Sequence, residues 1–251
     1  MKARVAIALA WVLALSGCAA TKQVSDNSYQ APSTDYRLIV MEPDVQVAVL
    51  TAGGMLEPRQ DWTDQARAHV VKALQDQQRS RGGHIRVATS PEEAGGDPQA
   101  LIELSRLHTA VGNAIKLHKY AGIPLPTKKS SFDWTLGELA VSYGKASSYD
   151  YALFVHAQDS FSSGGRVALQ AASFLGCMLG VCVIPQGGMQ IAFASLVDLK
   201  TGQVVWFNVL TSSVGDIRTK EGAAQMVDKL LGSMELGQPR ETPRKNGRRR
   251  A

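Results

Sequence analysis

The chain has 251 residues, of which 45% are hydrophobic and 20% are charged. This is the composition of an ordinary globular protein, and the length suffices for a sizeable core in one α/β domain or two small ones. The formal net charge of +5 comes from the two ends of the chain, so the body between them is nearly neutral, which argues against a nucleic-acid-binding domain.

The first 17 residues have the pattern of an export signal. Two basic residues precede residues 5–15, an apolar stretch of 11 residues that is too short to span a bilayer. The run Leu15-Ser16-Gly17-Cys18 then resembles the lipobox of bacterial lipoproteins. The resemblance implies that residues 1–17 are removed and that Cys18 is acylated on its sulfur and its nitrogen. An ordinary secretory signal with an incidental cysteine is the alternative.

Residues 18–35 are mostly small and polar, and we expect them to form the lipidated N-terminus and a flexible tether. The residue after Cys18 is Ala19 and not an aspartate. By resemblance to enterobacterial sorting rules, this residue favours transfer to the outer membrane over retention in the inner membrane. We therefore expect a protein anchored by lipid to the periplasmic face of the outer membrane.

Residues 36–236 are predicted to form the folded domain. Apolar residues at helical spacing predict a helix over 61–78 with Thr63 as its N-cap, and Asp97-Pro98 is a strong start for a second helix. In chain order, the elements expected in the first half are strands at 38–41 and 45–50, the helix at 61–78, a strand at 85–88, the helix from 97 onward and a short helix at 134–143.

The second half of the domain is richer in strands. Residues 151–157 are apolar and β-rich, as a central strand would be. A hairpin of 189–199 and 204–211 follows, with Trp206 expected to be buried, and a helix over 219–234 ends the domain. The elements together predict an α+β fold, a mixed β-sheet with helices packed on it, as a single compact domain after the tether.

Residues 167–184 form an uncharged stretch of 18 residues, which reaches the lower limit of a membrane span. Gly176 and Gly180 have the spacing that allows two helices to approach closely. One interpretation is a helix buried inside the domain, or a helix that continues into a strand. The other is a helix that forms an oligomer or inserts into a membrane.

The residues with catalytic potential form no recognisable site. No pair of histidines has the spacing of a zinc protease, and no nucleophile elbow or phosphate-binding glycine loop is present. Acidic residues such as Glu138, Asp150 and Asp159 are not spaced as an acid/base pair. We therefore expect no catalytic residues, no metal and no cofactor, and we expect the histidines to lie on the surface or in the core. The five histidines are His69, His84, His108, His118 and His156.

The hairpin around Asp198–Trp206, followed by a terminal helix, looks like that of envelope lipoproteins of the curli-secretion-channel type and of the penicillin-binding-protein activators. The resemblance covers about residues 151–234 and implies a periplasmic domain without catalytic residues that acts in envelope assembly. Its partners would be the membrane, through the lipid anchor, other envelope proteins and a second copy of the chain, with no nucleic acid. The alternatives are a binding module for a lipid or small apolar ligand, and an enzyme acting on envelope polymer.

Residues 237–251 are rich in proline, glycine and arginine, and we expect them to be disordered. A basic tail of this kind either binds anionic lipid or polymer near a surface, or serves as a solubilising terminus.

Cys177 and Cys182 lie five residues apart in a chain that is expected to reach an oxidising compartment. Five residues of α-helix rise about 7.5 Å, whereas a disulfide needs Cα atoms within about 7 Å. A continuous helix would therefore keep both thiols reduced, and a turn near Gly180 would allow the bond. Intact mass after alkylation under denaturing, non-reducing conditions decides: two alkylated cysteines exclude the bond, and none excludes a continuous helix.

Overall fold

The computed structural model describes residues 20–25, 36–79, 84–128, 131–178, 180, 185–212 and 215–234. Its strands are β1 (Ala20–Ser25), β2 (Arg37–Val40), β3 (Asp44–Leu50), β4 (Leu56–Pro58), β5 (His84–Val87), β6 (Tyr151–Ser162), β7 (Gln190–Asp198) and β8 (Val204–Ser212). Its helices are α2 (Gln60–Arg79), α3 (Pro91–Ala94), α4 (Pro98–Ile115), α5 (Gly137–Ser147), α6 (Gly164–Met178) and α7 (Lys220–Leu231), and the π-helix η1 (Lys116–Tyr120) extends α4.

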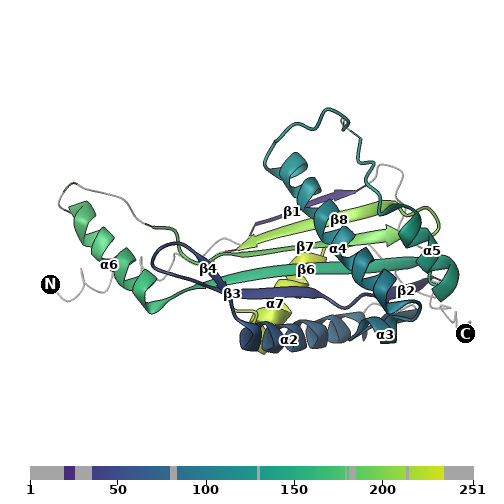
Figure 1. Cartoon of the computed structure of the whole chain (residues 1–251), viewed down its shortest axis with the longest axis horizontal. Helices are drawn as coiled ribbons and strands as arrows, with labels where there is room; N and C mark the ends of the chain where they lie inside the picture. The colour runs from purple at the N-terminus through teal and green to yellow at the C-terminus, as the bar shows by residue number, and fades with distance from the viewer. Residues whose placement is uncertain are drawn as a thin grey trace, which may run out of the picture.

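The strands form one mixed sheet in the order β1-β8-β7-β6-β2-β5, and β3 and β4 lie off this path (Figure 1). Along the part of the sheet ordered β1-β8-β7-β6, each strand is antiparallel to the next. On the other side of β6, both β2 and β3 run parallel to it. Residues 41–43 separate β2 from β3, and the chain continues in the same direction along β6 on both sides of this break. The sheet and its helices confirm the predicted fold class, a mixed sheet with helices packed on it.

Helices cover both faces of the sheet. On one face α2 and α7 pack over side chains of β2, β3, β6, β7 and β8, in a core that includes Leu74, Leu153 and Trp206. On the other face α4 and α5 pack over the alternate residues of β2, β6, β7 and β8, in a core that includes Leu104, Phe154 and Phe193. Because both faces are buried over the first half of β6, residues 152–155 are apolar on both faces, which explains the poor alternation in the sequence.

Of the two N-caps predicted from the sequence, Asp97 is confirmed and Thr63 is not. Asp97 caps α4 by accepting a hydrogen bond from Gln99 N, with Pro98 in the first turn, and Thr219 caps α7 in the same way through Gly222 N. The prediction that Thr63 caps α2 is wrong. Thr63 lies inside the helix, where its hydroxyl accepts a hydrogen bond from Val47 N at 3.0 Å and ties α2 to β3.

The prediction of a flexible tether over all of residues 18–35 is wrong at residues 20–25. They form β1, which pairs with β8 in antiparallel register from Ala20 opposite Thr211 to Ser25 opposite Trp206. The physical reason is that the outer edge of β8 needs backbone hydrogen-bond partners, and Val24 adds an apolar contact to the core beneath α4. Cys18, residues 1–17 and residues 237–251 lie outside the described residues.

Trp206 is the largest of the fully buried side chains among the described residues, with 1% of its surface exposed. The prediction that it is buried is therefore confirmed. Truncation to alanine removes the indole from between β8 and the helices α2 and α7, so we expect Trp206→Ala to lower the free energy of unfolding by about 3–5 kcal/mol. Urea denaturation of the two proteins measures the difference, and Lys200→Ala, in the exposed hairpin turn, should change it by less than about 0.5 kcal/mol.

Candidate functional site

A buried polar cluster lies between α4 and the sheet. His156 Nδ1 lies 2.8 Å from Asp44 Oδ2, and the hydroxyl of Thr109 donates to the same oxygen at 3.0 Å. His108 Nε2 lies 2.9 Å from the hydroxyl oxygen of Ser195. The register places Asp44 opposite His156 across β3 and β6, so the sheet itself brings this pair together. The cluster thus contains an aspartate, two histidines and a serine.

The charges of this cluster follow from its burial. Burial lowers the pKa of His108 to about 3, so its ring is neutral at physiological pH. Burial acts to raise the pKa of Asp44, but the hydrogen bond and charge of His156 and the hydrogen bond from Thr109 outweigh it, so the pKa lies below its usual value. Asp44 is therefore an ionised, fully hydrogen-bonded carboxylate.

This cluster is not arranged for nucleophilic catalysis. Ser195 has 1% of its surface exposed, so no substrate can reach its hydroxyl. The histidine that contacts Ser195 is His108, whereas Asp44 orients the other histidine, so the three groups do not form a serine–histidine–aspartate relay. The hydrogen bonds instead hold α4 on the sheet, where Gly112 lets the helix backbone approach Phe193; a Cβ at that glycine would lie 2.2 Å from the ring.

Two of the acidic residues singled out from the sequence, Asp150 and Asp159, are also far apart. Asp150 precedes β6 and is bonded to Arg37 N and to Lys200, whereas Asp159 lies nine residues further along the same strand. An extended strand rises about 3.3 Å per residue, which separates the two by about 30 Å. Pairs of carboxylates in glycosidases lie within about 10 Å of each other. Among the described residues no group of three or more metal-ligating side chains is placed to hold a metal ion.

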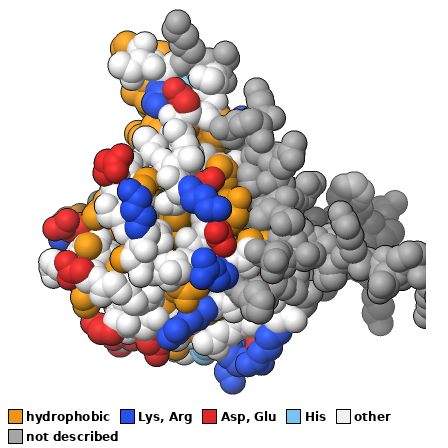
Figure 2. Space-filling model, turned by 90° about the vertical axis from the view of Figure 1, so that its right-hand side faces the viewer, with side chains coloured by type: hydrophobic (Ala, Val, Ile, Leu, Met, Phe, Trp, Pro, Cys, Tyr) orange, Lys and Arg blue, Asp and Glu red, His pale blue; other side chains and the backbone are white. Residues whose placement is uncertain are grey.

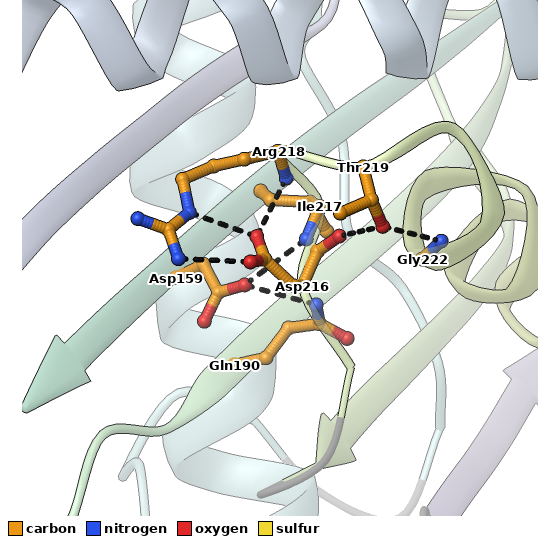
Figure 3. Close-up of polar contacts among 7 residues, drawn as sticks. All are labelled: Asp159, Gln190, Asp216, Ile217, Arg218, Thr219 and Gly222. Atoms are coloured by element: carbon orange, nitrogen blue, oxygen red, sulfur yellow. Dashed lines mark hydrogen bonds and ion pairs between the residues drawn. The ribbon is translucent and has the colours of Figure 1, made fainter.

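Asp159 belongs to a second polar network, at the junction of β6, β7 and the start of α7 (Figure 3). Its Oδ2 accepts hydrogen bonds from Gln190 Nε2 at 3.2 Å and from Ile217 N at 3.5 Å. The neighbouring Asp216 carboxylate is held by the Arg218 guanidinium at 2.8 Å and 2.9 Å. Burial raises the pKa of Asp159 to about 6, although its hydrogen bonds act to lower it.

Arg218 links this network to the helix layer. Its guanidinium carbon lies 4.2 Å from the ring centroid of Trp62 on α2 and 3.7 Å from that of Phe161 on β6. A cation between two aromatic faces stabilises both contacts. The network therefore joins the ends of β6, β7, α2 and α7, and its role is structural.

A cleft of about 450 Å³ opens beside the break between β2 and β3. Its charged lining residues are Glu42, Asp44, Arg67 and Arg106, and its floor is apolar. Arg67 lies 3.9 Å from Glu42. Charged side chains of both signs therefore line the cleft. Arg67 lies beside Glu42, and Asp44 belongs to the buried cluster.

The packing of the domain does not account for helix α6 (Gly164–Met178), which we call the apolar arm. It projects from one end of the sheet (Figure 1), and none of its residues is buried. Its polar side chains and Gly176 and Cys177 are half-buried against the chain, whereas its exposed side chains are all apolar. The exposed side chains are Val167, Ala168, Leu169, Ala171, Ala172, Phe174, Leu175 and Met178.

The structure of the apolar arm excludes some of the interpretations of residues 167–184. A helix buried in the core is wrong, because the arm has no buried residue. The pairing of Gly176 with Gly180 on one helix face is also wrong, because α6 ends at Met178 and Gly180 takes a φ of 93°, outside the helical range. No helix in the described ranges has the length and hydropathy needed to cross a bilayer.

The end of α6 contains Cys177, one of the two cysteines that the sequence analysis considered for a disulfide. Cys177 forms a disulfide, and Gly180 N donates to Cys177 O at 3.2 Å in the turn that follows the helix. Its partner cysteine lies outside the described residues, as does Cys182, so the pairing of Cys177 with Cys182 stays a prediction. A turn at Gly180 ends the helix between the two positions and so allows such a bond.

The fold defines a class of protein with a mixed sheet between two helix layers and an exposed apolar helix at one end. No family model and no curated protein matches the chain. Among solved structures, the PelC dodecamer from Paraburkholderia phytofirmans is 14% identical, with a TM-score of 0.40 over 88% of this chain and 100% of that one. The LpoB C-terminal domain from Salmonella enterica is 13% identical, with a TM-score of 0.26 over 74% of this chain and 86% of that one.

Likenesses of this size carry no argument about activity, partner or assembly. The functional argument therefore rests on the geometry of this chain.

The raised pKa of Asp159 predicts a specific pH dependence. The folded chain binds this proton more tightly than the unfolded chain, whose aspartate pKa is near 3.8, so the contribution to stability is present below about pH 4 and is lost as the pH rises through about 6. Asp159→Asn cannot ionise. We expect its stability relative to the parent to rise by on the order of 2–3 kcal/mol between pH 4 and pH 7.

Urea denaturation of both proteins across this pH range measures the difference. Asp216→Asn is the matched control from the same network. Its carboxyl has a pKa below the usual value because of the hydrogen bond from Arg218, so the stability difference between its variant and the parent changes mainly below about pH 4 and should stay nearly constant between pH 4 and pH 7. Parallel pH profiles for the parent and Asp159→Asn would contradict the raised pKa.

Proposed function

We propose that this chain is a lipid-anchored protein of the bacterial cell envelope that acts by contact with other envelope components and not by catalysis. The observation that carries the proposal is the apolar arm, in which the polar side chains turn toward the chain and the apolar side chains turn outward. A helix that faces water has the opposite pattern. An exposed apolar surface of this kind marks a site of contact with a protein or a membrane.

The interior of the domain supports a non-enzymatic role. Its buried histidines and carboxylates are hydrogen-bonded to one another and to the backbone, so they serve to fix the helices on the sheet. Ser195 is closed to substrate, and the acidic residues Asp150 and Asp159 lie at opposite ends of β6. The partners that the proposal implies are other envelope proteins or a second copy of this chain, in addition to the membrane that carries the anchor.

The anchor in this proposal is Cys18, and the sequence Leu15-Ser16-Gly17-Cys18 supports it. Several acyl chains hold a protein on a membrane far more firmly than one, since each buried methylene contributes about 0.8 kcal/mol. The outer membrane, on its periplasmic face, is the location that Ala19 favours.

The anchor is tested by Cys18→Ser. We expect the variant to lose all incorporation of labelled fatty acid and to be released from washed membranes, because serine has no thiol to receive the diacylglyceryl group. Ser28→Ala, in the same N-terminal segment, should be acylated like the parent. Continued labelling of the Cys18→Ser protein would show that the lipoprotein assignment is wrong.

A further inference from the structure

The apolar arm exposes large apolar side chains, whereas a helix that faces water exposes polar ones. Phe174 is 61% exposed, Leu175 is 62% exposed and Met178 is 75% exposed. After Arg166 the arm contains no charged residue. Large apolar side chains that gather at one place on a folded chain mark a surface that is covered in the working state of the protein.

The base of the arm is fixed to the body of the domain. The Arg166 guanidinium donates to Gln186 O at 2.9 Å and 3.0 Å and to Ala52 O at 3.2 Å. One turn further along, Gln170 Nε2 donates to Pro185 O at 3.0 Å. These bonds use the polar side of the helix, so they hold the apolar side outward in a defined direction.

Other exposed apolar residues lie at the same end of the sheet. The turn between β3 and β4 reaches the base of the arm through the bond from Arg166 to Ala52, and it carries Met55, which is 70% exposed, and Leu56. Met189, just before β7, is also exposed. The arm, this turn and Met189 together form what we call the apolar end.

The sheet register places the start of β1 at this same end. Ala20 lies opposite Thr211 at the end of β8, and the neighbouring Ser212 lies opposite Gln190 at the start of β7. Gln190 in turn lies opposite Asp159, near the end of β6 where the arm begins. Cys18 is two residues before Ala20, and two residues of chain span at most about 7 Å.

We propose that the apolar end rests in the surface of the lipid bilayer that holds Cys18, with the apolar arm lying along the interface. This inference rests on the proposed function, because it requires the acylated anchor. The arm has 15 residues, about 22 Å of helix, which is too short to span a bilayer and sufficient to lie on one.

The anchor favours lipid over a second copy of the chain as the occupant. It holds the arm beside the bilayer at all times, so the effective concentration of lipid at the arm is high. The opposite end of the molecule has a different character, since charged side chains of both signs are scattered over it (Figure 2). In this orientation that charged end faces away from the membrane.

The test uses the acylated full chain reconstituted into vesicles of phosphatidylethanolamine and phosphatidylglycerol, with or without bromine on the lipid acyl chains. Phe174→Trp places an indole on the outer side of the arm, and Leu175→Trp is a second variant at an equally exposed position. An interfacial helix buries its apolar side about 5–10 Å into the headgroup and acyl boundary, so brominated lipid should reduce the added indole emission by about half.

Lys200→Trp is the control, because Lys200 lies in the turn between β7 and β8, at the end of these strands opposite the apolar end, with 77% of its side chain exposed. Its emission should not change with bromination. Absence of quenching in both arm variants, in protein whose intact mass shows the acyl chains, would overturn the inference; a blue-shifted, unquenched emission would indicate a second copy as the occupant. Protein without acyl chains would overturn the proposed function and, with it, this inference.

Discussion

The structure depends on β6, the strand at which the antiparallel and the parallel parts of the sheet meet. One edge is antiparallel to β7 over nine residue pairs, and the other is parallel to β2 and then to β3. It therefore joins the antiparallel half of the sheet to the parallel half. Residues 152–157 of β6 are all buried between the two helix layers, which leaves few of these positions free to be polar.

The polar positions that remain are used to attach helices. His156 faces α4 through Asp44 and Thr109, and Asp159 faces the start of α7 through Ile217 N. A buried polar group without a partner costs on the order of 1–3 kcal/mol, so each such contact defines where the helix must lie. These groups are of the residue types found in active sites, but they are buried and closed to a substrate.

The same strand connects the core with the apolar arm. β6 ends at Ser162, and the arm begins two residues later, so the rigid core determines where the arm leaves the domain. Arg166 and Gln170 then donate hydrogen bonds to backbone carbonyls at residues 185–186, before β7, and to that of Ala52, between β3 and β4. An exposed apolar helix held in this way keeps its direction without burying its apolar side.

Local patterns in the sequence determined most of the secondary structure and the fold class, because caps, turns and helical spacing act between neighbouring residues. Asp97, Thr219 and the hairpin turn after Asp198 are examples. Tertiary structure decided what depends on distant partners: the pairing of residues 20–25 with β8, the position of Thr63 inside α2, and the outward direction of the apolar arm. An uncharged segment is equally compatible with a core and with a surface, and only the space left by the rest of the fold distinguishes them.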